Sequence, residues 1–175
     1  MDGNNGLSWA DVKLKSLLFQ ETQAVGVELA PQQVDLFLAY GRQLATENKR
    51  FNLSAITDPE EVIRKHFVDS LAALPYLPLE SEKLVDIGSG AGLPGLALKI
   101  VRPRIKVTLI ESINKKATFL SQTASRLALT DVTVCPRRAE EVGQDPLFRE
   151  QFSVATARAV ASLAVLLELA LPLIT

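Results

Sequence analysis

The chain has 175 residues, of which 47% are apolar and 22% charged, the balance of an ordinary globular domain with one sizeable core. A single cysteine excludes a disulfide framework and favours a reducing, cytoplasmic compartment. Its apolar stretches fall short of the roughly 20 residues that span a bilayer. The first five residues are polar, unlike a secretory signal, so we expect no membrane association. The net charge of −1 gives no overall attraction to nucleic acid, so any RNA contact must come from local basic clusters.

The first part of the chain, residues 1–78, carries only helical patterns. Pro31 suits the first turn of a helix, and apolar residues follow it at the spacing of one helix face. Asp58, followed by a proline and two glutamates, predicts a capped helix start. That helix should run through Phe67 and end near Pro75. We expect a helical subdomain packed on the main domain, because its apolar faces are too small for a separate core.

The second part, residues 79–175, alternates between strands and helices. Strands are expected at Lys83–Ile87, Lys106–Ile110, Val132–Cys135 and Phe152–Ala157, and helices at Leu93–Val101, about 114–129 and Leu163–Leu171. This alternation implies right-handed parallel crossovers. The predicted fold class is therefore α/β, with a doubly wound, mostly parallel sheet.

A glycine cluster follows the first expected strand. Gly88, Gly90, Gly92 and Gly95 would let a ligand approach the backbone and the start of the next helix. The last three also satisfy the dinucleotide pattern G-x-G-x-x-G, so a nicotinamide-dependent oxidoreductase is one alternative. Asp86, at the end of the strand, would repel a pyrophosphate but suits a cationic amine or sulfonium. The loop also lacks a basic phosphate clamp, and both details favour a nucleoside without phosphates.

Glu111 ends the second expected strand, 19 residues after Gly92. A carboxylate in this position can accept both hydroxyl protons of a ribose. Glu111 therefore supports the binding of a cofactor that contains adenosine, but it does not distinguish one such cofactor from another.

Five short strings taken together are far more specific than the glycine cluster alone. They are Asn52-Leu53-Ser54-Ala55-Ile56, His66 through Asp69-Ser70-Leu71, Val85 to Gly95, Arg138-Ala139-Glu140-Glu141 and Ala157-Arg158-Ala159. With these strings the chain resembles the RsmG (GidB) family, the bacterial 16S rRNA guanine-N7 methyltransferases, over about residues 30–171. The resemblance implies the class I fold of methyltransferases that use S-adenosylmethionine, with an N-terminal helical extension. It implies S-adenosylmethionine as the cofactor and 16S rRNA as the partner, leaving open whether the RNA is naked or in a small-subunit particle.

The resemblance also implies roles for individual residues. Gly88 and Leu93 would line the methionine side of the cofactor, and Glu111 would hold the ribose. Ala139 and Glu140 would meet the adenine, while Arg158 would lie beside the cofactor and the entering base. With the glycine cluster included, the expected cofactor-binding residues are Asp86, Gly88, Gly90, Leu93, Glu111, Ala139, Glu140 and Arg158.

The residues agree with methylation at N7. Guanine N7 already carries a lone pair, so no general base is needed and positioning is the main contribution. We expect Arg158 to be a positioning residue, because a guanidinium cannot act as a base at neutral pH. The segment from Ala157 to Val160 lacks the Asn/Asp-Pro-Pro-aromatic pattern of exocyclic amine methylation. Cys135, the one candidate thiolate for carbon-5 methylation, is expected in the core. No metal site is expected.

Candidate substrate-binding residues come from two places. His66 and Asp69 lie on the last N-terminal helix, where the lone histidine could equally be structural. Lys115 and Lys116 follow Glu111 at the ligand edge of the sheet, where they could contact RNA phosphates. We expect a monomer.

The end of the chain departs from the expected pattern. A methyltransferase sheet of this class normally finishes with two more strands, whereas this sequence stops at Thr175. We therefore expect a C-terminally incomplete domain whose terminal strands are missing. A non-catalytic adenosine-binding module is a further alternative for this reason.

Overall fold

The computed structural model describes Trp9, residues 12–78 and residues 83–175. Two expectations fall on residues outside this description: the domain boundary between residues 78 and 79, and the polar first five residues. The elements in chain order are α1 (Val12–Ala24), α2 (Pro31–Phe51), α3 (Pro59–Val62), a π-helical segment (Ile63–Val68), α4 (Asp69–Leu71), a 3-10 turn (Leu74–Tyr76), β1 (Lys83–Ile87), α5 (Gly95–Val101), β2 (Lys106–Ile110), α6 (Asn114–Arg126), β3 (Val132–Cys135), α7 (Ala139–Gln144), β4 (Val154–Ala157), α8 (Leu163–Ala170) and a 3-10 turn (Leu171–Leu173).

The four strands form one parallel sheet in the order β3-β2-β1-β4. Ile87 at the end of β1 pairs with Ile110 of β2 and Ala157 of β4, and Ile110 pairs with Cys135 of β3. The carboxyl ends of all four strands therefore lie level at one edge, where α/β proteins bind ligands. The predicted α/β fold class is confirmed.

Some elements differ from the sequence expectation. The fourth strand begins at Val154, because Phe152 instead makes an isolated bridge to Ile174. The helix expected from Leu93 begins at Gly95, because the preceding residues form the turn that follows β1. The short helix α7 was not expected, since its six residues are too few to show a helical period.

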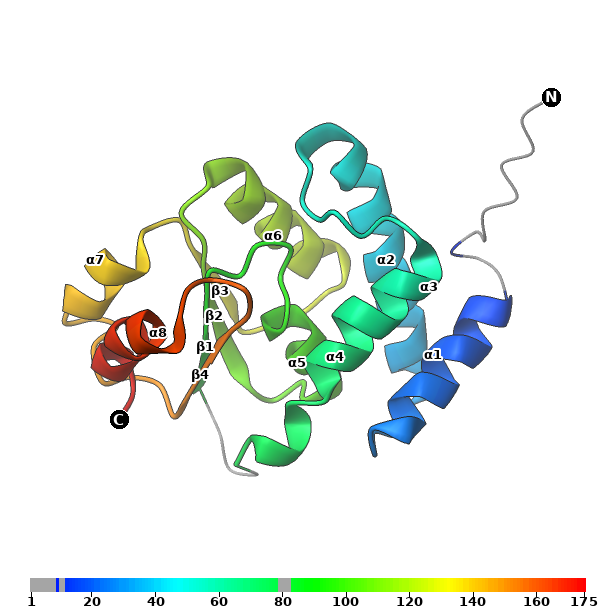
Figure 1. Ribbon diagram of the computed structural model, residues 1–175, viewed down its shortest axis with the longest axis horizontal. Coiled ribbons are helices and arrows are strands. Elements are labelled where there is room, and N and C mark those ends of the chain that lie inside the picture. The colour runs from blue at the N-terminus through cyan, green and yellow to red at the C-terminus, as the bar shows by residue number, and fades with distance from the viewer. Residues whose placement is uncertain (1–8, 10–11, 79–82) are drawn as a thin grey trace.

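Helices cover both faces of the sheet. Figure 1 shows α7 and α8 on one side and α5, α6 and the N-terminal helices on the other. Side chains alternate between the two faces along each strand. Leu84 and Leu109 join the core under the N-terminal helices, while Val85 and Ile87 join the core under α7 and α8.

The helical run from Pro59 to Leu71 is continuous but irregular. Asp58 caps it by accepting a hydrogen bond from the Glu61 N–H at 3.0 Å, as the sequence pattern predicted. Its middle part, Ile63–Val68, is π-helical. Such segments are frequent at functional sites, and this one carries His66.

An aromatic cluster joins α2 to the segment Ile63–Val68. The Phe67 ring packs against Phe37 and Tyr40, with ring centroids 5.1 and 5.3 Å apart. All three side chains are fully buried. The Tyr40 hydroxyl reaches the glycine loop and donates to the Ala91 carbonyl oxygen at 2.5 Å. This hydrogen bond joins the helical part of the chain to the glycine loop, and the dependence of residues 1–78 on the rest of the chain stays a prediction.

An isolated fragment of residues 1–78 should therefore not unfold cooperatively. Without the sheet layer, Phe37 and Tyr40 lose much of the apolar surface that buries them. Thermal unfolding followed by circular dichroism, with the whole chain as control, measures this. A sharp transition in the fragment would contradict the prediction.

Candidate functional site

The buried carboxylate of Asp86 organises the glycine loop. Asp86 is 0% exposed at the end of β1. One of its oxygens accepts from the Gly95 N–H at 3.2 Å, and the other accepts from the Thr156 hydroxyl at 3.0 Å. A Cβ on Gly95 would lie 2.9 Å from the Asp86 carboxylate and 2.6 Å from Leu109, so only glycine lets α5 begin this close to the sheet.

Burial raises the pKa of the Asp86 carboxyl group to about 6, while the hydrogen bonds from Thr156 and Gly95 oppose this rise. The side chain faces the sheet and α5 and does not line the neighbouring cavities. A direct contact between Asp86 and a cationic cofactor group stays a prediction, and the structure places Asp86 beneath the loop.

Two cavities meet at Gly88, on the carboxyl edge of the sheet. The larger has a volume of about 310 Å³ and the smaller about 120 Å³. The larger is lined by Leu53, Ser54, Lys65, His66, Asp69, Gly88, Ser89, Gly90, Ala91, Leu93, Arg158 and Ala159. The smaller is lined by Ile87, Gly88, Ile110, Glu111, Ser112, Arg137, Arg138, Ala139, Glu140, Val160 and Leu169. Every expected cofactor-binding residue except Asp86 lines one of the two.

Glu111 connects the end of β2 to the glycine loop. Its carboxylate accepts from the Gly90 N–H at 2.9 Å and from the Ile113 N–H at 2.8 Å. The residue is only 6% exposed. Each carboxylate oxygen has a further lone pair, so Glu111 can still accept hydrogen bonds from a ligand in the smaller cavity.

The segment after β4 closes over Gly88. Gly88 has a φ of +66°, and a Cβ there would lie 2.7 Å from a methyl carbon of Val160. Gly88 is therefore required both by its backbone conformation and by this close approach. The sequence analysis gave Val160 no role, and no pattern in the sequence could have indicated one.

Arg158 reaches from β4 to the N-terminal helices. Its Nη1 donates to the Asp69 carboxylate at 2.7 Å and to the Lys65 carbonyl oxygen at 3.1 Å. Its Nη2 lies 3.2 Å from His66 Nδ1. The structure thus brings Arg158, an expected cofactor-binding and positioning residue, together with His66 and Asp69, which the sequence analysis had grouped as candidate substrate-binding residues.

His66 joins this cluster to the loop before α3. Its Nε2 lies 2.6 Å from the Ser54 hydroxyl oxygen. Burial, together with the positive charge of Arg158, lowers the pKa of His66, so the ring is neutral at pH 7. Because a guanidinium can only donate, we assign a lone pair to Nδ1 and the proton to Nε2, which donates to Ser54. Ser54 belongs to one of the family-like strings, but sequence reasoning gave it no role.

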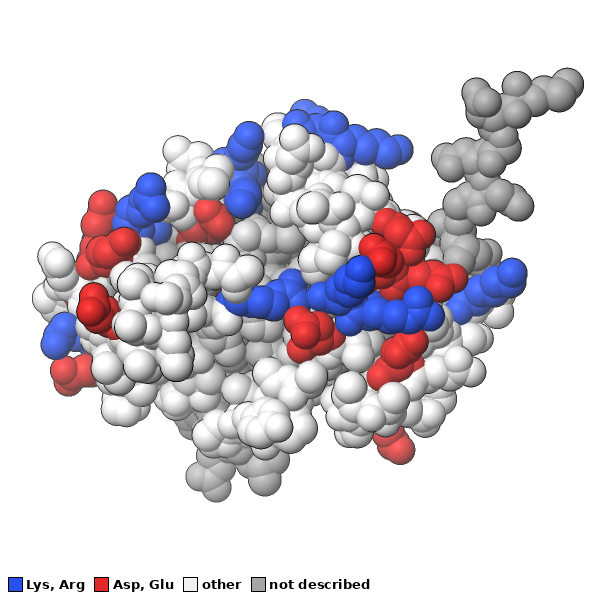
Figure 2. Space-filling view, viewed as in Figure 1, with Lys and Arg blue, Asp and Glu red and all other residues white. Residues whose placement is uncertain are grey.

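The expected RNA-binding lysines lie outside the cavities. Lys115 and Lys116 belong to the first turn of α6, just after Glu111 at the carboxyl edge of the sheet, and Lys115 is exposed. Their contact with RNA stays a prediction. Figure 2 shows a row of Lys and Arg side chains across the N-terminal helices with acidic side chains beside it. Among the basic residues of these helices, Arg64 and Lys65 are paired with glutamates.

No group of three or more His, Cys, Asp or Glu side chains in the described residues is arranged to hold a metal ion. Within residues 12–78 and 83–175, no helix combines the length and the apolar character needed to cross a bilayer.

One family model matches residues 33–175, and it describes rRNA small subunit methyltransferase G. The chain belongs to this family. It is 44% identical over 164 residues to the ribosomal RNA small subunit methyltransferase G of Acetivibrio thermocellus, which covers 94% of this chain and 68% of the relative. It is 50% identical over 148 residues to the protein of that name from Roseiflexus castenholzii, covering 85% of this chain and 63% of the relative. The chain thus spans about two thirds of the length of these two relatives.

Solved structures also resemble the chain. A crystal structure of MtNAS in complex with MTA and tNA aligns with 85% of this chain and 46% of the other, at 18% identity and a TM-score of 0.45. A mutant of the same protein in complex with S-adenosylmethionine aligns with a TM-score of 0.44.

The stability of this family member should carry a pH dependence from Asp86. The pKa of Asp86 in the folded protein, about 6, lies above its ordinary value of 3.8, so the folded protein holds the proton more tightly than the unfolded chain. The stabilisation is complete below pH 3.8 and is lost as the pH rises through 6, by about 3 kcal/mol in total. Denaturant unfolding at pH 4 to 7 should show the free energy of unfolding of the native chain falling relative to Asp86→Asn. A constant difference across this range would contradict the prediction.

Proposed function

We propose that this chain is a methyltransferase that uses S-adenosylmethionine to methylate N7 of a guanine in 16S rRNA. The observation that carries the proposal is the pair of cavities meeting at Gly88 in a member of this family. One cavity ends at the Glu111 carboxylate, and the other ends at the cluster of Arg158, His66 and Asp69.

The residues present fit the cofactor. Glu111 would accept hydrogen bonds from the ribose hydroxyls. Ala139 and Glu140 begin α7 and would face the adenine, since backbone N–H groups in a first helical turn lack partners within the helix. Beyond Gly88, the methionine part would lie in the larger cavity, beside Leu93.

S-adenosylmethionine supplies an electrophilic methyl group on a sulfonium. Because guanine N7 already has a lone pair, the protein's task is to orient the base and exclude water. Arg158 would orient the base through its planar guanidinium, which can donate hydrogen bonds or stack. Its ion pair with Asp69 offsets a positive charge that would otherwise oppose a cationic product. Neutral His66 adds no further charge.

Two alternatives are separated by direct experiments. A nicotinamide-dependent oxidoreductase predicts binding of NAD, and calorimetric titration with NAD and with S-adenosylmethionine tests this. A non-catalytic adenosine-binding module predicts cofactor binding without turnover. Incubation with methyl-labelled S-adenosylmethionine and 16S rRNA, naked or in small-subunit particles, should yield 7-methylguanosine. Its absence with both substrates would refute the proposed function.

We also propose that the chain acts as a monomer in the cytoplasm.

Glu111→Ala should weaken the binding of S-adenosylmethionine by about 1–3 kcal/mol, because charge-assisted hydrogen bonds to the ribose are lost. The substitution also removes the acceptors for Gly90 and Ile113. Calorimetry measures the affinity, and Glu28→Ala, at an exposed acid before α2, is the control. Unchanged affinity in a folded Glu111→Ala variant would show that the ribose is held elsewhere.

Arg158→Lys should lower kcat on rRNA at least about tenfold, since lysine keeps the charge but cannot contact Asp69 and His66 with a planar fork. The melting temperature should stay close to that of the native chain. Arg126→Lys at the end of α6 provides the matched control. Near-normal turnover in Arg158→Lys would mean that the fork is not needed.

A further inference from the structure

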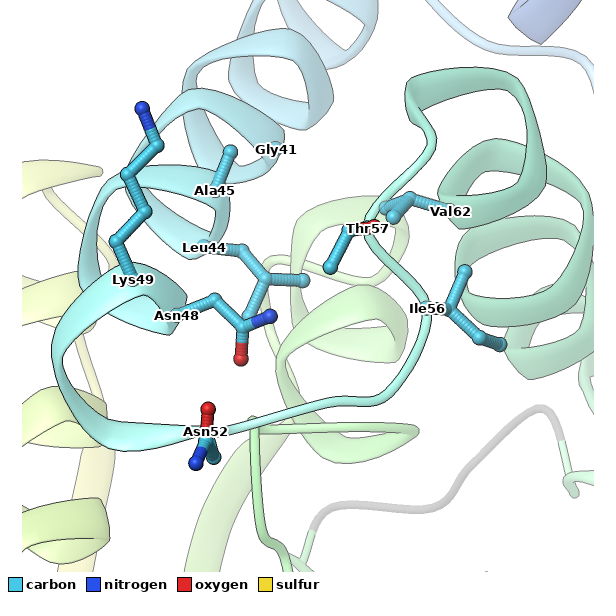
Figure 3. Close-up of a pocket in the computed structure, with 9 residues that line it drawn as sticks. All are labelled: Gly41, Leu44, Ala45, Asn48, Lys49, Asn52, Ile56, Thr57 and Val62. Carbon is cyan, nitrogen blue, oxygen red and sulfur yellow. The ribbon is translucent and has the colours of Figure 1, made fainter.

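A third cavity lies apart from the cofactor site. It has a volume of about 370 Å³ and lies between α2 and the loop at residues 52–57. Figure 3 shows Leu44 projecting from α2 toward Thr57 and Val62 on the opposite wall. We propose that this cavity binds the base of an unpaired rRNA nucleotide close in sequence to the methylated guanine. This inference rests on the proposed function.

The lining of the third cavity suits a nucleobase. Leu44, Ala45, Ile56 and Val62 provide apolar surface for the faces of a base. Apolar walls with a few polar groups, at volumes of about 300–1,000 Å³, are typical of small-ligand sites. These walls alone would accept many apolar groups, so the polar groups must define the ligand.

Two polar side chains are available at the third cavity. Asn52 and Thr57 line it and are exposed. Neither side chain has a hydrogen-bond partner among the described residues. An amide presents a donor and an acceptor side by side, which matches the edge of a base, and a hydroxyl can do either. The cavity can therefore hydrogen-bond a base edge without breaking an existing contact.

The loop wall is held in place before any ligand arrives. The Asn48 amide donates to the Ser54 carbonyl oxygen and accepts from the Ser54 N–H, both at 2.8 Å. The Asn52 N–H donates to the Asn48 carbonyl oxygen at 3.1 Å. A preformed wall reduces the entropy lost on binding.

The charge beside the third cavity favours a nucleotide over an apolar peptide. Lys49 lines the cavity and is exposed, and its ammonium group has no acidic partner among the described residues. Nearby Arg50 is paired with Glu47, and Lys65 is paired with Glu61. Lys49 is therefore available to contact the phosphate attached to a bound base.

One short loop separates the third cavity from the larger cofactor cavity. Leu53 and Ser54 line the cofactor side, while Asn52, Ile56 and Thr57 line the other side. Nearby nucleotides of a single strand can therefore enter both cavities at once. RNA is commonly recognised through such unstacked bases. Holding one base behind the loop would orient the guanine in front of it.

Two substitutions test the third cavity. Ala45→Phe fills it from α2, and Ala72→Phe adds the same bulk at an exposed position at the end of α4. Thr57→Val removes the hydroxyl at constant shape, and Thr130→Val does the same at an exposed position before β3. We expect Ala45→Phe to raise KM for protein-free 16S rRNA at least tenfold and Thr57→Val to raise it several-fold. The two control variants should keep the native KM. In all four variants, the affinity for S-adenosylmethionine and the melting temperature should match those of the native chain.

The outcomes are distinguishable. An unchanged KM in a natively stable Ala45→Phe variant would overturn the inference. A defect seen with small-subunit particles but absent with protein-free rRNA would also overturn it, since the occupant would then be a ribosomal protein. If the native chain binds S-adenosylmethionine but methylates no rRNA, the proposed function fails. The inference is then decided by filter binding of 16S rRNA, and equal affinity of the native chain and Ala45→Phe refutes it.

Discussion

The hydrogen bonds of the buried Asp86 carboxylate hold together the edge of the sheet at which two cavities lie. They join β1 to the first residue of α5 and to Thr156 of β4. A buried carboxylate is costly unless it is hydrogen-bonded, and its raised pKa reflects this cost. The hydrogen bond from the Gly95 N–H to Asp86 holds the end of the turn from Gly88 to Gly95 against the sheet. The two cavities lie on either side of Gly88 in this turn.

The N-terminal helices complete the site that the sheet begins. Tyr40 contacts the glycine loop through Ala91, and Arg158 crosses from β4 to Asp69. Lys65, His66 and Asp69, which contact Arg158, precede it by 89 to 93 positions in the sequence and line the same cavity. The π-helical segment places His66 within reach of both Ser54 and Arg158. One hydrogen-bonded cluster, built from the N-terminal helices and the end of β4, thus lines the larger cavity.

Much of the fold could be predicted because its signals are local. The strands β1, β2 and β3 have the expected boundaries, and the Asp58 cap forms as its pattern predicted. The prediction was wrong where tertiary contacts decide: Phe152 leaves β4 to bridge Ile174, and α7 is too short to show a period. The expected site residues are gathered at one sheet edge because parallel strands place their carboxyl ends together. Their contacts with a cofactor stay predictions.

The sequence by itself determined the strand-helix alternation, the glycine loop and the acids at the ends of β1 and β2, because each depends on neighbouring residues and a simple period. Only the tertiary structure decided that Asp86 lies beneath the loop and Glu111 beside it. The tertiary structure alone also decided that Arg158 pairs with Asp69 and that the loop at residues 52–57 separates two cavities. These arrangements join segments distant in sequence, and the packing of the N-terminal helices on the sheet selects them. No local pattern encodes such a choice, because it depends on which surfaces are buried together.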